Sequence, residues 1–236
     1  MSSPTDLQAQ LDNITTQTRA LVQPERLAIT DRAIRDLHAT GIEDRILPIG
    51  ALAPTFALPG ASATTLSNAT TNGKLVHSSD LLAIGPLIVT FFRGRWCPYC
   101  ITELEAWQAA FPAVRERGAL LVAISPQLPR QNDFTVQQHN LTFPLLSDAG
   151  ARIATAFGIA YTVPEPLRAH YRSILINIPF IHGDQGDDTW RLPLPATFVI
   201  QPTRDTAGNI TGRITFAEAH ADHRVRPDPK DVLASI

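Results

Sequence analysis

The feature that most constrains this chain is a pair of cysteines, Cys97 and Cys100, that stand between a predicted strand and a predicted helix. Residues 87–92 form a short apolar run rich in β-branched and aromatic side chains, which predicts a buried strand. Apolar residues then recur at steps of three and four, which predicts a helix that ends near Gly118. Cys97 therefore falls at the N-cap of this helix, with Pro98 as the first helical residue.

This placement predicts a reactive thiol. The N-terminus of a helix presents unpaired N–H groups and the positive end of the helix dipole, and both favour a thiolate over a thiol. Arg93 and Arg95 add positive charge just before the cysteines. Since the thiolate is the nucleophilic form, the pair indicates redox chemistry.

The alternative for two closely spaced cysteines is half of a zinc site. Zinc would need two more ligands, and the best candidates are His220 and His223. Structural zinc sites keep their ligand pairs closer in sequence, and zinc would not explain the position between strand and helix. We therefore expect no bound metal and interpret both histidines as surface or partner contacts.

The composition argues against several other functions. The chain has 20 Lys plus Arg against 22 Asp plus Glu, so it lacks the basic surplus of a nucleic-acid-binding protein. Residues 46–73 carry no charge, but the prolines among them are unlike a membrane span. The N-terminus has no signal-peptide pattern. We expect a cytoplasmic protein with no nucleic-acid or membrane partner.

The remaining pattern alternates strands with helices, which predicts an α/β sandwich. Residues 174–193 are expected to form an irregular loop. The expected strands are 119–124, 143–146, 196–201 and 211–219, and the expected helices are 130–139, 148–157 and 229–236.

Residues 1–45 are predicted to form a helical extension to a domain at residues 46–236. Two amphipathic helices are separated near Pro24 and closed by Gly41. They could pack on the domain, form the contact of a homodimer, or make a weak coiled coil. Packing on the domain is the commonest outcome for such helices, and we favour it.

Four segments resemble the peroxiredoxin-like branch of the alkyl hydroperoxide reductase and thiol-specific antioxidant superfamily. They read IGALAPTFALPG, GPLIVTFFRGRWCPYCITEL, LPATFVI and HADHRVRPDP, and the resemblance covers roughly residues 46–236. It implies a thioredoxin-like, peroxiredoxin-type fold and an antioxidant enzyme that reduces hydrogen peroxide or organic hydroperoxides without a cofactor. The implied electron donors are thioredoxin, glutaredoxin or glutathione.

The chain departs from the pattern of that family at several positions. The family motif P-x-x-x-T-x-x-C places Arg93 where the family has Pro, and Cys97 where it has Thr. The peroxidatic cysteine of the family then falls on Cys100. The peroxide-binding Arg of the family falls on Pro195, two residues before Thr197, so both positions are candidate substrate contacts.

Compared with thioredoxins, the chain is similar at one position and differs at another. Pro195 is similar to the cis-proline that thioredoxins place beside their cysteine pair. Thioredoxins also keep a buried Asp six residues before the first cysteine, where this chain has Phe91.

Two mechanisms stay open at this point. In a peroxidase, Arg93 or Arg95 would bind the peroxide, Trp96 would shield the thiols, and a sulfenic acid on one cysteine would condense with the other into a disulfide. In a thiol-disulfide oxidoreductase, Cys97 would attack a protein disulfide and Cys100 would resolve the mixed disulfide. The helix N-cap favours Cys97 as the exposed thiol of low pKa, and the family spacing favours Cys100 as the peroxide-reactive thiol.

Overall fold

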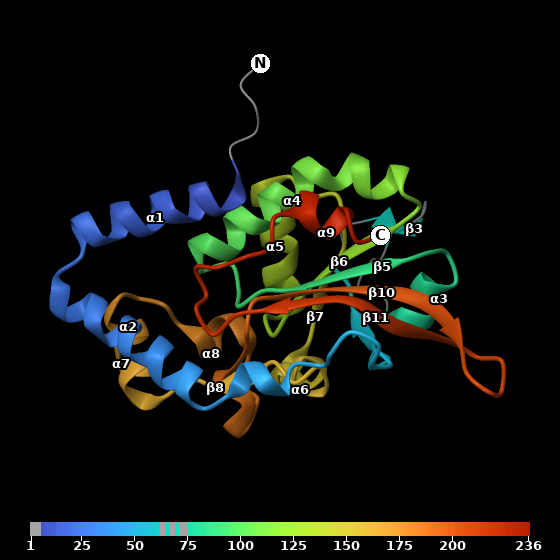
Figure 1. Ribbon diagram of the computed structural model, residues 1–236. Helices are drawn as coiled ribbons and strands as arrows, with labels where there is room; N and C mark the ends of the chain where they lie inside the picture. Colours follow the sequence, from blue (N-terminus) through green and yellow to red (C-terminus); the bar gives the residue numbers. More distant parts are fainter. Residues whose placement is uncertain (1–5, 62–64, 67–68, 71–74) are drawn as a thin grey trace, which may run out of the picture.

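The computed structural model describes residues 6–61, 65–66, 69–70 and 75–236, and a five-stranded mixed sheet lies at its centre (Figure 1). Its strands are β5 (Leu87–Phe91), β6 (Leu120–Ser125), β7 (Leu145–Ser147), β10 (Ala196–Arg204) and β11 (Ile210–Ala219). They are ordered β11-β10-β5-β6-β7. β5, β6 and β7 run parallel, whereas β10 pairs antiparallel with both β5 and β11.

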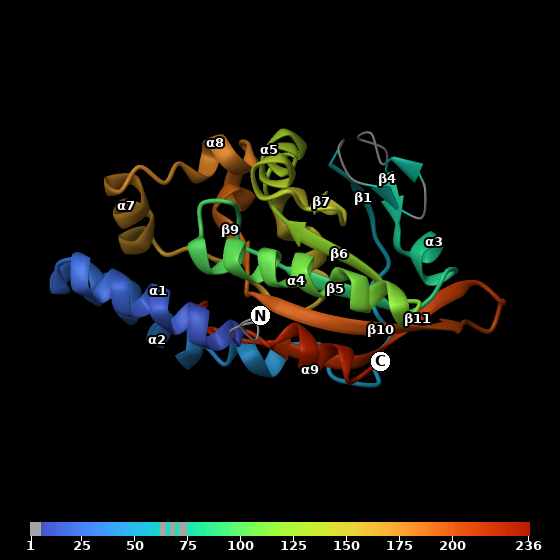
Figure 2. The ribbon, with the colours of Figure 1, turned by 90° about the horizontal axis from the view of Figure 1, so that it is seen from above.

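Both faces of the sheet are covered, which confirms the predicted α/β sandwich (Figure 2). Successive side chains of β5 point to opposite faces, so that Ile88 and Val89 join different hydrophobic clusters. The first face carries α4 (Pro98–Glu116), α5 (Pro129–His139) and α9 (Pro229–Leu233). The second face carries α3 (Ser78–Leu82), α6 (Arg152–Ala156), β1 (Ala57–Pro59) and β4 (Leu75–His77).

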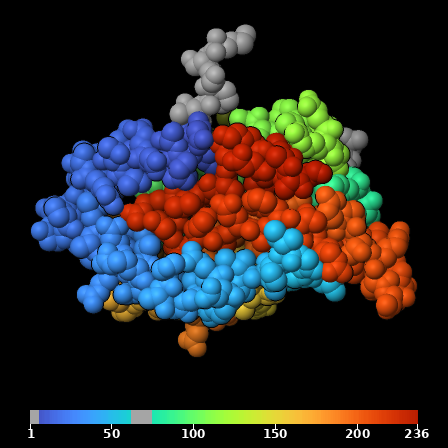
Figure 3. Space-filling model, viewed as in Figure 1, coloured from blue at the N-terminus to red at the C-terminus, as the bar shows by residue number. Residues whose placement is uncertain are grey.

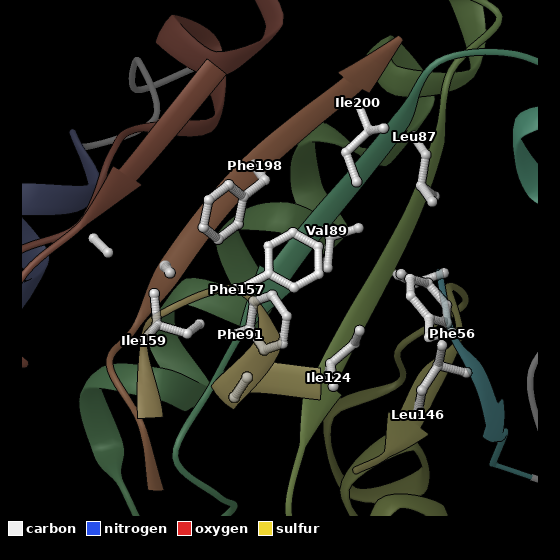
Figure 4. Packing of buried hydrophobic residues seen from close by; sticks show 14 of the residues in the cluster. Phe56, Leu87, Val89, Phe91, Ile124, Leu146, Phe157, Ile159, Phe198 and Ile200 are labelled. Atoms are coloured by element: carbon white, nitrogen blue, oxygen red, sulfur yellow. The ribbon is translucent and has the colours of Figure 1, made fainter. Parts of the chain in front are cut away.

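Three phenylalanines pack together on the second face (Figure 4). The ring centroids of Phe91 and Phe157 are 5.2 Å apart, and those of Phe157 and Phe198 are 4.8 Å apart. All three side chains are fully buried. Because close packing restricts side-chain motion, this cluster fixes the end of β5, where the loop to the cysteines begins.

The strand and the helix predicted on either side of the cysteines are confirmed as β5 and α4. The prediction of an irregular loop over residues 174–193 is partly wrong. This segment contains α8 (Ile178–His182), the 3-10 helix η3 (Gly186–Trp190) and β9 (Arg191–Pro193). Elements of three to five residues are too short to show a hydrophobic period, so the sequence pattern could not reveal them.

The other short elements connect these layers. They are η1 (Ile42–Arg45), β2 (Thr65–Leu66), β3 (Ala69–Thr70), η2 (Ala149–Ala151), α7 (Glu165–Ser173) and β8 (Ala160–Thr162), which pairs with β9. In the described part of the chain, no helix is both long and apolar enough to cross a membrane.

The two predicted N-terminal helices are present as α1 (Leu7–Leu21) and α2 (Pro24–Ala39). α1 lies against α4 and buries Leu7 and Leu11 in the cluster that also contains both cysteines. α2 lies against α7. The helices therefore pack on the surface of the same chain, which is the favoured alternative, and the C-terminal segment lies between them (Figure 3).

We expect the contact between α1 and the rest of the chain to contribute substantially to stability. Leu11 is fully buried, so L11A should lower the free energy of unfolding by about 2–5 kcal/mol through lost burial and a residual cavity. Urea denaturation followed by circular dichroism measures this change. L21A is the matched control, because Leu21 on the same helix is 86% exposed and should change stability by less than about 0.5 kcal/mol. Equal effects of the two substitutions would contradict the packing of α1.

Candidate active site

The cysteine pair lies where β5 ends and α4 begins, as predicted. Cys97 is the N-cap residue of α4 and Pro98 is the first helical residue. Both cysteines are reduced and buried. Besides its place at the start of the helix, Cys97 has Cys100, Arg93 and Arg226 around its sulfur, and these groups act on its pKa.

Arg93 is the nearest cation to Cys97. Its Nη1 lies 3.9 Å from Cys97 Sγ, its Nη2 donates a hydrogen bond to the Tyr171 hydroxyl, and its guanidinium lies 4.7 Å from the centre of the Trp96 ring. Gly94 makes this arrangement possible. It has φ +145°, and a Cβ there would lie only 2.6 Å from Trp96 Nε1.

The surroundings give the two thiols different acidities. Burial by itself would raise the pKa of Cys97, but a hydrogen bond with Cys100 and the charges of Arg93 and Arg226 lower it to about 6. Burial and the neighbouring Cys97 raise the pKa of Cys100 well above its usual value. At neutral pH, Cys97 is therefore the thiolate and Cys100 keeps its proton.

We expect R93M to raise the pKa of Cys97, because the substitution removes a positive charge beside the thiolate. The rate of alkylation by iodoacetamide should rise with pH around a midpoint of about 6 in the wild type. In R93M the midpoint should move up by roughly one unit or more. R95M is the matched control and should leave the midpoint in place. An unchanged midpoint in R93M would show that Arg93 does not stabilise the thiolate.

Arg95 does not lie at the cysteines. Its Nε donates to Gln131 Oε1 at 2.7 Å, its backbone N–H donates to Gln127 Oε1 at 2.9 Å, and its guanidinium lies 4.7 Å from the centre of the Phe134 ring. α5 therefore holds this side chain away from Cys97. Of the two arginines predicted for the site, the structure brings only Arg93 to the thiolate.

A buried ion pair that the sequence analysis missed lies beside Cys100. Arg226 Nε donates to Glu103 Oε2 at 2.6 Å, and Arg226 Nη2 lies 3.6 Å from Cys100 Sγ. Burial raises the pKa of Glu103 to about 7, although Arg226 opposes this shift. The chain thus has a buried acid beside its second cysteine, although the position of the thioredoxin Asp is occupied by Phe91.

One signal in the sequence could have indicated Glu103. It lies three residues after Cys100, which places both side chains on the same face of α4. No local pattern indicates Arg226, which is 126 residues from Cys100 in the chain. Arg226 also supplies a guanidinium at the cysteines, although the position of the family arginine is occupied by Pro195.

Thr197 and Pro195, the two predicted substrate contacts, lie away from the cavities at the cysteines. Thr197 is buried, and its hydroxyl donates to Thr90, which in turn donates to Glu103 Oε1 at 3.1 Å. The described residues contain no cis peptide bond, so the resemblance of Pro195 to the thioredoxin cis-proline is wrong. Neither residue lines the cavities at Cys97.

His223 lines both cavities at the site, whereas we expected a surface or partner contact. Its ring lies edge-on to Tyr99, with 5.4 Å between the ring centroids. Burial, followed by the charges of Arg93, Arg226 and Arg224, holds the pKa of His223 well below its usual value, so this histidine is neutral. Within the described ranges, no three His, Cys, Asp or Glu side chains are grouped to hold a metal.

Two neighbouring cavities lie between the N-terminal helices and the rest of the chain. The cavity at Cys97 has a volume of about 260 Å³, and its neighbour has about 190 Å³. Both are lined by Thr30, Arg93, Tyr171 and His223. Side chains of both N-terminal helices line the cavity at Cys97, among them Thr15 and Arg19 of α1 and Leu27 of α2, so α1 and α2 form a roof over Cys97.

Two donors at the cavity have no partner in the described part of the structure. They are Arg93 Nε and Trp96 Nε1, and both atoms are buried. Buried donors are normally hydrogen-bonded, so an acceptor brought in by a ligand would satisfy them. Since both residues line the cavity at Cys97, that acceptor would lie beside the thiolate.

A reduced cysteine pair at the start of a helix, next to a mixed sheet with this strand order, defines a thioredoxin-like protein of the peroxiredoxin type. The model of the AhpC/TSA family matches residues 49–206, and the chain belongs to that family. The N-terminal helices, His223 and Arg226 all lie outside the matched residues. The candidate site therefore includes segments beyond the part that the family model matches.

Individual relatives agree with this assignment. The chain is 28% identical over 91 residues to thiol-disulfide oxidoreductase ResA of Bacillus thuringiensis, covering 37% of this chain and 50% of the relative. It is 27% identical over 110 residues to chloroplastic peroxiredoxin Q of Populus jackii, covering 47% of this chain and 46% of the relative. The chain thus spans about half the length of these curated relatives.

A solved structure shares the fold over most of the chain. Peroxidoxin BcpB of Mycobacterium tuberculosis superposes with a TM-score of 0.55 at 19% identity, covering 80% of this chain and 96% of that one. At this identity, the likeness establishes the peroxiredoxin-type fold that the sequence predicted.

Proposed function

We propose that the chain is a thiol-dependent peroxidase that reduces hydrogen peroxide or small organic hydroperoxides. Membership of the AhpC/TSA family supports an oxidoreductase. The observation that carries the proposal is the position of Cys97. This thiol has a pKa lowered to about 6, is 2% exposed, and opens into a cavity of about 260 Å³ under the N-terminal helices. A cavity of this size admits a small hydroperoxide but not a folded protein.

The reaction uses both cysteines. The Cys97 thiolate attacks the terminal oxygen of the hydroperoxide, which gives a Cys97 sulfenic acid and an alkoxide or hydroxide that leaves as an alcohol or water. Arg93 would bind the substrate through its unpartnered Nε–H. The Cys100 thiol then attacks the sulfenic sulfur, releases water and forms the Cys97–Cys100 disulfide.

The disulfide needs an external thiol to restore it. Glutathione is small enough to enter beneath the roof formed by α1 and α2. Thioredoxin and glutaredoxin can reach the disulfide only if that roof moves, so we expect glutathione to reduce the protein faster than a protein thiol of equal reducing strength. We further propose that residues 1–45 are an extension to the domain at residues 46–236, and that the protein works in the cytoplasm, where thiols stay reduced.

A second candidate function is the reduction of protein disulfides. The likeness to ResA and the placement of Cys97 at a helix N-cap favour it. The roof opposes it, because a protein disulfide must meet the attacking sulfur in line.

One comparison separates the two functions. The same protein is tested in two assays: consumption of hydrogen peroxide with glutathione as reductant, and reduction of insulin disulfides. We expect peroxide turnover that depends on Cys97 and little reduction of insulin. Rapid insulin reduction with no peroxide turnover would contradict the peroxidase and make protein-disulfide reduction the favoured function.

A further inference from the structure

We propose that Tyr171 is a catalytic residue that protonates the oxygen leaving from the hydroperoxide, a role that rests on the proposed peroxidase function. Tyr171 lies on α7, is 5% exposed, and lines both cavities at the site. It lies 78 residues after Arg93 in the chain.

Arg93 links the tyrosine hydroxyl to the thiolate. One terminal nitrogen of Arg93 donates to Tyr171 and the other lies 3.9 Å from Cys97 Sγ. The guanidinium is rigid and planar, so it holds hydroxyl and thiolate next to one another. Packing of the Tyr171 ring against Trp96, with 5.1 Å between the ring centroids, fixes the orientation of the ring.

The hydrogen-bond pattern leaves the proton of Tyr171 available. Its oxygen accepts from Arg93, so its own O–H can only donate elsewhere. Among the described residues, none accepts a hydrogen bond from this O–H. Burial, outweighing the charge of Arg93, raises the pKa of Tyr171, so the hydroxyl keeps its proton at neutral pH.

The chemistry requires such a donor. When Cys97 sulfur bonds to the terminal oxygen, the O–O bond breaks and its electron pair stays on the departing oxygen. Hydroxide is a poor leaving group, since water has a pKa of about 15.7. Transfer of the Tyr171 proton releases water or an alcohol, and the tyrosinate, held beside Arg93, takes a proton back from solvent.

The choice of oxidant tests this role. Peracetic acid expels a carboxylate, whose conjugate acid has a pKa of about 4 and which needs no proton to leave. We expect Y171F to lower the rate constant for oxidation of Cys97 by hydrogen peroxide about 100-fold, and that for peracetic acid less than about threefold. Stopped-flow tryptophan fluorescence follows both reactions, and circular dichroism checks the fold.

Two further variants sharpen the result. Y99F is the matched control, because it removes the hydroxyl of another buried tyrosine that lines the same cavity. This hydroxyl shares a hydrogen bond of 3.1 Å with Thr15 and none with Arg93. The ratio of the two rate constants should therefore stay at the wild-type value. Incorporation of 3-fluorotyrosine at position 171 keeps the donor and should retain the rate with hydrogen peroxide within about threefold.

The other outcomes are equally clear. An equal fall for both oxidants in Y171F, with a shifted midpoint of alkylation, would show that Tyr171 only positions Arg93, and no fall would exclude any role. A wild-type protein that reacts with neither oxidant faster than free cysteine would refute the peroxidase function and this proposal together.

Discussion

C97S should lose its reaction with hydrogen peroxide completely, whereas C100S should still react once per chain. The reason is that Cys97 has the pKa of about 6 and lines the cavity, while the pKa of Cys100 is raised and its sulfur is fully buried. In C100S the sulfenic acid on Cys97 has no partner thiol and should accumulate in stoichiometric amount. Mass spectrometry after one equivalent of peroxide, with dimedone to trap sulfenic acid, measures both results.

This experiment also decides between the two assignments of the peroxide-reactive thiol. The spacing of the peroxiredoxin motif favours Cys100, and the position at the helix N-cap favours Cys97. Sulfenic acid in C97S and none in C100S would contradict the assignment drawn from the structure. The wild type should form one intramolecular disulfide, which non-reducing electrophoresis distinguishes from a covalent dimer.

R226M should have the largest effect on stability of any single substitution at the site. It removes the partner of Glu103, which is 1% exposed, and an unpaired buried charge typically costs about 3–5 kcal/mol. The loss should depend on pH. The pKa of Glu103 is about 7 with Arg226 present and should rise further without it.

The sign of the pH dependence follows from linkage. A carboxyl whose pKa is higher in the folded state than in the unfolded state contributes most stability below its unfolded value of about 4.5, and this contribution is lost as the pH rises through the folded value. R226M should therefore lose more stability relative to the wild type at pH 8 than at pH 5, by up to about 1.4 kcal/mol, because the wild-type carboxyl ionises near pH 7 and the variant carboxyl keeps its proton to higher pH. Urea denaturation at the two pH values measures the difference.

A double variant provides the control for this prediction. E103Q/R226M removes both charges, so it should recover the extra stability that R226M loses between pH 5 and pH 8, and its own loss should not change with pH. A loss in R226M that is equal at both pH values would mean that the cost comes from packing and not from the charge of Glu103.

The sequence by itself determined the strand, the cysteine pair and the helix that follows, together with the N-cap position of Cys97. These features are local, since side-chain periodicity and the order of residues along the chain decide them. Side-chain periodicity also predicted the two N-terminal helices. The sequence could not show which surface those helices cover, because a hydrophobic face indicates burial and does not identify its partner.

Only the tertiary structure decided which charges act on the thiols. Arg93 and Arg95 are two residues apart and equally plausible in sequence. Gln131 of α5 nevertheless holds the Arg95 side chain away, whereas Arg93 reaches Cys97. Arg226 and Tyr171 arrive from segments 126 and 78 residues from their partners, at positions that no local period marks. Electrostatic effects depend on distance in space, so the chemistry of this cysteine pair is fixed by how distant segments pack around it.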